Sequence, residues 1–199
     1  MSKKKIILIW FLCLSPFVGV FTIMYLTTLG VFGPLPSFDQ LENPKSNLAT
    51  IVYSADGIIL GEYYYENRSN VKYPEISEHL IHALISTEDI RFNDHSGIDI
   101  RSLFRAVFGV FVGKKSGGAS TITQQLSKML FTERPASGVE RVQQKLKEWV
   151  VAVRLEERYS KNEILTMYLN RFDWINQAVG LKSAAKIYFN TSPDKLTIP

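Results

Sequence analysis

The pattern of apolar and polar positions divides the chain into an apolar start and a longer remainder of mixed character. No charged side chain occurs between Ile6 and Phe38, and the stretch Ile6–Phe32 is strongly apolar. Because about 20 apolar residues suffice to span a bilayer as a helix, we predict a transmembrane signal anchor over residues 6–32. A cleaved signal peptide and a buried core helix are the alternatives, but a signal peptide has an apolar core of only about 7–15 residues.

The flanks of this apolar run predict its orientation. Lys3, Lys4 and Lys5 form a short tail, residues 1–5, that we expect to stay in the cytoplasm because positive flanks resist translocation. The expected location is therefore the cytoplasmic (inner) membrane, crossed once, with the catalytic part outside the cytoplasm. Residues 33–48, which include Gly33, Pro34 and Pro36, are expected to form a stiff linker.

Beyond the linker the pattern changes to that of a β-hairpin. Two β-rich runs, residues 49–53 and 58–65, flank the turn sequence Ser54–Gly57, in which Asp56 precedes Gly57. An Asp-Gly pair between two such runs is typical of a hairpin turn.

The remainder has the periodicity of helices. Apolar residues spaced by three or four positions predict helices that begin near residue 76, cover 99–112, 121–131 and 139–158, begin after a capping box at Ser160–Glu163, and cover 178–188. The glycine-rich stretch Gly113–Ala119 is expected to be a flexible loop. The predicted fold class is thus mainly α, with a small β-hairpin after an amino-terminal transmembrane helix.

The helix expected over 99–112 is unusually apolar. Beyond Asp99 at its start, its only charged residues are Arg101 and Arg105. A buried core helix explains this composition. The alternative is a helix partly immersed in a membrane surface, with the arginines near lipid headgroups.

The net charge of +4 does not indicate a nucleic-acid partner. Three of the four charges are Lys3, Lys4 and Lys5, so the rest of the chain is almost neutral. A nucleic-acid binder would usually concentrate Lys and Arg on one face of its folded domain. The single cysteine, Cys13, lies in the apolar run, so no intrachain disulfide can form.

Two predicted helices carry polar residues where a plain solvated face would carry Glu and Lys pairs. In the helix over 121–131, Thr121, Gln124, Gln125 and Lys128 gather on one side, where neutral donors and acceptors beside a cation suit sugar hydroxyls and a phosphate. In the helix over 139–158 the expected core stripe consists of Val142, Leu146, Trp149, Val150 and Val153.

Opposite that stripe lie Arg141, Gln144, Lys145 and Glu148. Glu148 borders an apolar continuation of its side, and a carboxylate in such a place needs a cation or a function. Lys145 or Arg141 would supply the cation, and a purely structural ion pair is the alternative.

A further pair of carboxylates, Glu88 and Asp89, ends the first helix after the hairpin. Adjacent side chains point in different directions, so we do not expect these two to act as one acid–base pair. His95 is expected to be structural. Glu88 and Glu148 together permit a two-carboxylate sugar enzyme as one possibility.

Five motifs that follow one another along the chain resemble those of the family 51 peptidoglycan glycosyltransferases, the transglycosylase domain of class A penicillin-binding proteins. The resemblance covers about residues 45–195 and rests on five motifs: Thr87–Gly97, Gly118–Gln125, Gln144–Glu148, Tyr159–Asn170 and Gly180–Phe189. Gln144 stands where the family has Arg, and Ile175 and Asn190 stand where glycine is usual.

The resemblance implies an α-helical, lysozyme-like domain over residues 49–199, with a subdomain near the membrane, that polymerises lipid II, an undecaprenyl-pyrophosphoryl disaccharide pentapeptide. It implies inverting transfer to β-1,4-linked strands with release of undecaprenyl diphosphate. Glu88 would be the general base, and Glu148 would assist at the donor side. The implied substrate-binding residues are Asp89, Ser120, Thr121, Thr123, Gln124, Gln125, Lys128 and Lys145, of which some only hold the walls of the groove together. Lys128 and Lys145 would offset the charge of the diphosphate.

The resemblance also leaves open a divalent cation, Mg²⁺ or Mn²⁺, near the diphosphate. The implied partners are lipid II, the growing glycan strand, membrane lipid and other cell-wall synthesis proteins. Because the family continues beyond the position of Pro199, we expect the domain to be truncated at its carboxyl end. A catalytically idle membrane-anchored scaffold and a membrane-anchored lytic enzyme are the alternatives, although a hydrolase has no diphosphate for Lys128 and Lys145 to neutralise.

Overall fold

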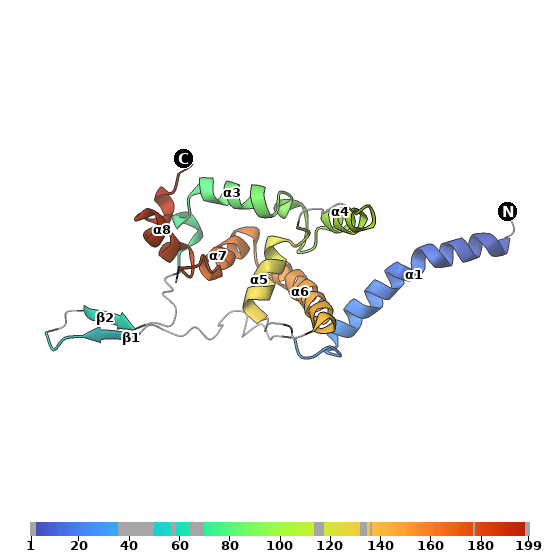
Figure 1. Ribbon diagram of the computed structural model, residues 1–199, viewed down its shortest axis with the longest axis horizontal. Helices are drawn as coiled ribbons and strands as arrows, with labels where there is room; N and C mark the ends of the chain where they lie inside the picture. The colour runs from blue at the N-terminus through green and yellow to red at the C-terminus, as the bar shows by residue number, and fades with distance from the viewer. Residues whose placement is uncertain are drawn as a thin grey trace.

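The computed structural model describes residues 3–35, 50–56, 59–63, 70–113, 118–131, 135, 137–176 and 178–197 (Figure 1). Its elements, in chain order, are α1 (Lys3–Thr28), β1 (Thr50–Tyr53), β2 (Ile59–Tyr63), η1 (Tyr73–Glu75), α3 (Glu78–Glu88), η2 (Phe92–Asp94), α4 (Ile100–Phe111), α5 (Ile122–Phe131), α6 (Gly138–Arg158), α7 (Lys161–Arg171), α8 (Leu181–Phe189) and η3 (Pro193–Lys195). The predicted class, mainly α, is confirmed.

Helix α8 begins later than the sequence pattern predicts. Residues 178–180 precede it as irregular backbone, because Trp174 N–H donates to the carbonyl of Ala178 and Gly180 has a φ of +81°. A Cβ at Gly180 would lie 2.8 Å from the carbonyl oxygen of Asn170, so the backbone there approaches α7 as only glycine allows.

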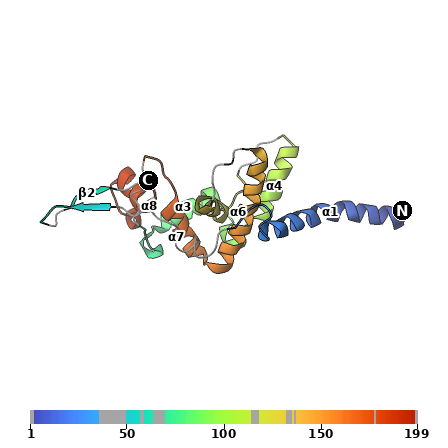
Figure 2. The same cartoon turned by 90° about the horizontal axis from the view of Figure 1, so that it is seen from below.

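Helix α1 extends away from the other helices at its amino end and contacts α6 toward its carboxyl end (Figures 1 and 2). It covers most of the segment predicted to be a membrane anchor. Among the helices of the described residues, none meets the length and apolarity required to cross a membrane. The single transmembrane span therefore stays a prediction.

Strands β1 and β2 pair antiparallel within the segment where the sequence predicts a hairpin. The register places Thr50 opposite Tyr63 and Val52 opposite Gly61, with an irregularity between Val52 and Tyr53. Residues 57–58 and 64–65 of the predicted hairpin lie outside the described residues, as does most of the predicted linker, 36–48. The pair projects from the side of the helical body opposite to α1 (Figure 1).

The core forms where α5 packs against both α6 and α7. Ile122 and Leu126 of α5, Leu155 of α6, and Ile164 and Leu169 of α7 are completely buried. The capping box predicted at Ser160–Glu163 is present at the start of α7. Because α5 packs against both α6 and α7, its first turn has a fixed position relative to the side chains around it.

The core stripe predicted for α6 is only partly correct. Val142 is 61% exposed, but Val150 of the same stripe is buried, as are Gln144 and Glu148 on the other side. That side continues as Val151, Ala152 and Leu155, which are also buried, as their apolar character indicates. One contact on this side joins α6 to α5: Ser127 Oγ donates to the backbone carbonyl of Glu148 at 3.0 Å.

Helix α4 is not a buried core helix. Its side chains Ile100, Phe104 and Phe108, spaced by four residues on one side, are 62%, 59% and 70% exposed. Val112, just after the helix, continues the row. These exposures exclude the core interpretation for that side of α4 and agree with the membrane-surface alternative.

Candidate active site

The first turn of α5 is fixed by two side chains from outside the helix. Asp89 Oδ2 accepts the N–H of Ile122 at 3.1 Å, and Thr121 Oγ1 accepts the N–H of Gln124 at 3.1 Å. These backbone donors have no partner within the helix itself. The same Thr121 hydroxyl donates to the carbonyl of Gly97 at 2.7 Å, which joins α5 to the loop after η2.

That loop contains a buried histidine–carboxylate pair. His95 Nε2 lies 3.1 and 3.0 Å from the two carboxylate oxygens of Asp89, and the N–H of Gly97 donates to His95 Nδ1 at 3.2 Å. Since Nδ1 accepts, the network assigns the proton of a neutral imidazole to Nε2, which donates to Asp89. These contacts agree with the prediction that His95 is structural. Asp89, predicted to bind substrate, has internal partners on both oxygens instead.

Gly97 lies where this loop meets α6. With a φ of +89°, a Cβ there would lie 2.8 Å from the backbone carbonyl carbon of Ala152. Its carbonyl oxygen accepts from Gln124 Nε2 at 3.1 Å as well as from Thr121. One glycine therefore connects the loop to both α5 and α6.

Glu88, the last residue of α3, is exposed and held at one oxygen. Gln125 Nε2 donates to Glu88 Oε2 at 2.8 Å, and the hydroxyl of Tyr168 donates to Gln125 Oε1 at 3.2 Å. Burial, and then the negative charge of Glu88, raises the pKa of Tyr168 well above its usual range, so this hydroxyl keeps its proton. Among the described residues, none donates to Glu88 Oε1.

Lys145 joins the second predicted carboxylate to the loop before α5. Its Nζ lies 3.0 Å from Glu148 Oε2 and 2.7 Å from Ser120 Oγ. The Glu148 carboxylate is 5% exposed, and its Oε1 has no hydrogen-bond partner in the described part of the chain. The predicted ion pair between Lys145 and Glu148 is thus present.

A hollow of about 260 Å³ opens above these groups, which we call the Glu88 hollow. Its lining includes Glu88, Asp89, Ser102, Arg105, Ser120 and Thr121. Lys145 and Glu148 do not line it, but Lys145 contacts Ser120, which does. The structure therefore brings Glu88 together with Ser120 directly, and with Glu148 through Lys145.

Two residues predicted to line the groove, Thr123 and Gln124, are turned into the protein. Thr123 is buried and its Oγ1 donates to Glu156 at 2.6 Å, and the buried Gln124 donates to the carbonyl of Gly97. Thr121 donates to the same carbonyl but also lines the Glu88 hollow. These contacts hold the walls together. Lys128 is exposed in the last turn of α5 and does not line the Glu88 hollow.

The sequence pattern did not single out the contribution of α4 to this site. Asp99, Ser102 and Arg105, spaced by three, lie along one wall of the Glu88 hollow, and Arg91 donates to Asp99 Oδ2 from Nε at 3.0 Å and from Nη2 at 2.6 Å. Burial opposes the charge of Asp99, but hydrogen bonds from Arg91 and Ser102 outweigh it and lower the pKa of Asp99 to about 2. The spacing by three of Asp99, Ser102 and Arg105 was the sequence signal that could have predicted a shared polar side here.

Within the described residues, no three His, Cys, Asp or Glu side chains come together as metal ligands. The unpartnered Oε1 of Glu148 is a single oxygen that fits Mg²⁺ or Mn²⁺ only if substrate oxygens and water complete the coordination. Mg²⁺ is commonly bound in that way, by one or two carboxylates plus substrate phosphates.

Comparison with known proteins shows which family the sequence matches. The family described as Transglycosylase matches residues 56–199. The chain is 37% identical over 182 residues to penicillin-binding protein 1A of Neisseria flavescens, covering 91% of this chain and 22% of that protein. It is 37% identical over 165 residues to penicillin-binding protein 1A of Escherichia coli (82% and 19%), and 33% identical over 185 residues to that of Pseudomonas aeruginosa (91% and 22%). The chain thus spans about a fifth of the length of these curated relatives.

Proposed function

The chain belongs to the transglycosylase family, and on this premise we propose that it polymerises lipid II into the β-1,4-linked glycan strands of peptidoglycan. One observation carries the proposal. Glu88 and Ser120 both line one hollow, and Ser120 accepts from Lys145, which is paired with Glu148. A base therefore lies in the hollow, and a cation contacts one of its lining residues.

In the proposed step, Glu88 Oε1 takes the proton from the 4-hydroxyl of the acceptor N-acetylglucosamine. The hydroxyl oxygen attacks the anomeric carbon of the growing strand from the side opposite the diphosphate. The bond from that carbon to the diphosphate oxygen breaks, and undecaprenyl diphosphate leaves with the electron pair, so the α-linked donor becomes a β-linked product. Gln125 holds Glu88 Oε2 at 2.8 Å, which keeps Oε1 turned to the substrate.

The positive charge on the donor side comes from Lys145. Its Nζ is fixed by Ser120 and Glu148 before substrate binds, so it offsets developing negative charge with little reorganisation. We place the diphosphate near this ammonium group. Lys128, exposed on α5, offers a second positive charge farther along the same helix.

A divalent cation would be held by Glu148 through its unpartnered Oε1, together with diphosphate oxygens. When bound, it would supply further neutralisation of the diphosphate. Lys145 pairs with the other oxygen of the Glu148 carboxylate at 3.0 Å.

We further propose a single-pass position in the cytoplasmic membrane, with the helical domain outside. Exposed apolar side chains on α1, among them Trp10, Phe11 and Phe21, support a lipid contact. The exposed row on α4 would face the same surface, which brings the site close to a lipid-linked substrate. Membrane lipid, and other cell-wall synthesis proteins as partners, are part of this proposal.

The base assignment is tested by Glu88→Gln in the purified chain in detergent, with lipid II polymerisation as the readout. We expect the rate to fall at least about 10²-fold, the scale of general base catalysis. The matched control is Glu157→Gln, an exposed carboxylate on α6, which should polymerise at the wild-type rate. Glycan strands made by Glu88→Gln at the control rate would show that Glu88 is not the base.

The role of Lys145 is tested separately by Lys145→Ala. The KM for lipid II should rise about tenfold or more, the effect of losing a charge-assisted contact worth about 1.5–3 kcal/mol. Lys147→Ala, two residues along α6, is the control for loss of a lysine from this helix. An unchanged dependence on lipid II concentration would remove Lys145 from the donor side.

A further inference from the structure

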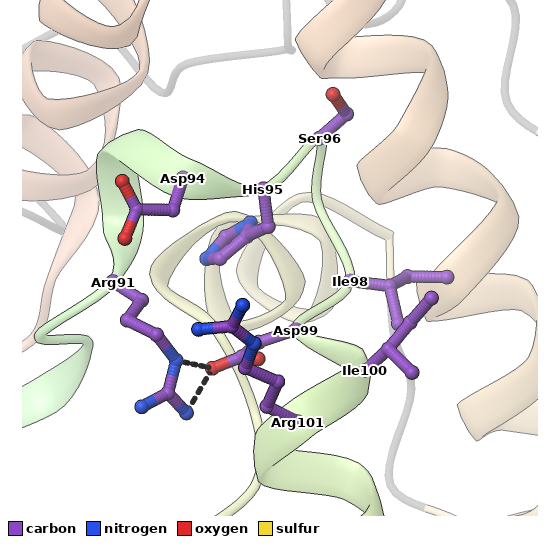
Figure 3. Close-up of a pocket in the computed structure, with 8 residues that line it drawn as sticks. All are labelled: Arg91, Asp94, His95, Ser96, Ile98, Asp99, Ile100 and Arg101. Carbon is purple, nitrogen blue, oxygen red and sulfur yellow. Dashed lines mark hydrogen bonds and ion pairs between the residues drawn. The ribbon is translucent and has the colours of Figure 1, made fainter.

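A second hollow, of about 520 Å³, adjoins the Glu88 hollow and is not used by the proposed reaction. It lies between the η2 turn and the first turn of α4, and we call it the Arg101 hollow. Figure 3 shows the side chains around it: the Asp94 carboxylate is on one side, Ile98 and Ile100 are on the other, and Arg101 extends between them.

The wall between the two hollows is fixed. Asp99 lines both of them, and Arg91, on the side of the Arg101 hollow, donates across the wall to Asp99 and to Ser102 Oγ at 2.7 Å. The Arg91–Asp99 pair is drawn as dashed lines in Figure 3. A group attached to a sugar in the Glu88 hollow would therefore reach the Arg101 hollow by passing one residue, Asp99.

The Arg101 hollow contains polar groups that the described part of the protein leaves unused. Within the described residues, the guanidinium of Arg101, the carboxylate of Asp94 and the hydroxyl of Ser96 make no hydrogen bond or ion pair. Arg91, in contrast, is committed to Asp99. The hollow thus offers one available guanidinium, one available carboxylate, a hydroxyl and two isoleucine side chains.

We propose that the Arg101 hollow binds the peptide branch of the lipid-linked substrate, with Arg101 paired to a carboxylate of that peptide. This rests on the proposed function, since it takes lipid II as the substrate. A peptide has carboxylate, amide and apolar groups, which match the mixed lining. A bare phosphate matches it less well, because it offers no amide or apolar group for Asp94, Ile98 and Ile100. A guanidinium also fits a carboxylate with two parallel hydrogen bonds.

The first experiment measures binding without turnover. A soluble disaccharide-pentapeptide and the same disaccharide without peptide are titrated, one at a time, into the full chain in detergent. We expect the wild type to bind the peptide-bearing compound more tightly. Arg101→Gln should weaken that binding by about three- to tenfold, the effect of one partly exposed charged pair, and Arg101→Lys should weaken it less.

The matched control is Lys182→Ala, which removes an exposed cation on α8, far from α4 in Figure 1. This variant should bind both compounds as the wild type does. Circular dichroism of each variant checks that the helices are intact, and Arg101→Lys keeps the comparison valid where Arg101→Gln does not fold. Equal binding of the two compounds by the wild type, or an equal change for both in Arg101→Gln, would overturn the proposal.

The second experiment separates this proposal from the proposed function. Polymerisation is measured with lipid II and with its peptide-free analogue, in vesicles with and without anionic lipid. Arg101→Gln should raise the KM for lipid II and leave the KM for the analogue unchanged. If the wild type polymerises neither substrate, the result counts against the proposed function. It does not decide the peptide site, which the binding titration tests independently. A KM change for both substrates that depends on anionic lipid would assign Arg101 to lipid headgroups and overturn the peptide site.

Discussion

Glu88 and Asp89 are adjacent carboxylates whose substitution should have opposite consequences. Glu88 is exposed and has a single donor among the described residues, whereas Asp89 is 7% exposed and accepts from both His95 and Ile122. We predict that Glu88→Gln removes activity and leaves stability unchanged. Asp89→Asn should lower stability first, and activity only through the displacement of α5.

The size of the stability loss expected for Asp89→Asn follows from the proton on His95 Nε2. Because Gly97 N–H occupies Nδ1, Nε2–H must donate to residue 89, where both carboxylate oxygens lie within 3.1 Å of it. An asparagine places an NH₂ group at one of those two positions, so a donor faces a donor or Ile122 N–H loses its acceptor. The lost charged hydrogen bond corresponds to about 1.5–3 kcal/mol.

The assay is thermal unfolding followed by far-ultraviolet circular dichroism in one detergent. For a chain of this length 1 kcal/mol corresponds to about 2–4 °C, so Asp89→Asn should unfold about 3–12 °C below the wild type. Glu88→Gln should unfold within about 1 °C of it. The reasoning is refuted if Asp89→Asn unfolds at the wild-type temperature, or if both variants lose stability equally.

Three further predictions concern the backbone and the wall of the site. Gly97→Ala should lower the unfolding free energy by at least about 2 kcal/mol, because the new methyl group meets the α6 backbone at 2.8 Å. Denaturant unfolding measures this change. A smaller loss of free energy would mean that the loop can move away from α6. Ile175→Asn should raise the unfolding temperature by about 2–8 °C, since Ile175 is 73% exposed and has a φ of +70°, a conformation that costs a residue other than glycine about 1–2 kcal/mol. An unchanged unfolding temperature would contradict the strain. The stability that Asp99 contributes is present above its ordinary pKa and should be lost as the pH falls from about 4 through its lowered pKa of about 2; Asp99→Asn should lack this part of the acid unfolding curve, and identical curves would contradict it.

The helices were largely predictable from the sequence, because their bounds depend on local signals. The predicted ranges 99–112, 121–131 and 139–158 agree with α4, α5 and α6 to within one residue at each end. What failed was the buried side of the first half of α6. Val142 was predicted to be buried but is 61% exposed, whereas Gln144 and Glu148 face the protein. Local periodicity does not reveal that α5 packs against this side.

For the site, the sequence indicated residues that lie near one another, while their roles stay predictions. Glu88 lines the hollow, and Lys145, paired with Glu148, contacts Ser120 in its lining. Thr123 and Gln124 were placed with them because they share a motif, yet both are buried and bonded within the protein. Sequence spacing shows which side of a helix a residue occupies and does not show what packs against that side.

The backbone conformation explains why glycine is usual at two positions of the family pattern. Ile175 and Asn190, which stand where glycine is usual, have φ values of +70° and +47°. Asn190 follows α8 in the left-handed conformation that asparagine tolerates, and Lys186 Nζ donates to its side chain at 2.6 Å. Ile175 has no comparable adaptation, so the strain predicted above is concentrated there.

The main chain of Gly97 also has a consequence for how the domain assembles. Its N–H donates to His95, and its carbonyl oxygen accepts from Thr121, just before α5, and from Gln124 within it. Docking of α5 and closing of this turn therefore depend on the same hydrogen bonds, and Lys161 Nζ adds a bond from α7 to the carbonyl of His95 at 2.7 Å. Native-state hydrogen exchange should therefore show the amides of Gly97 and Ile122 exchanging with the same opening free energy. The turn and the first turn of α5 would then open together, and the site would form as one cooperative unit.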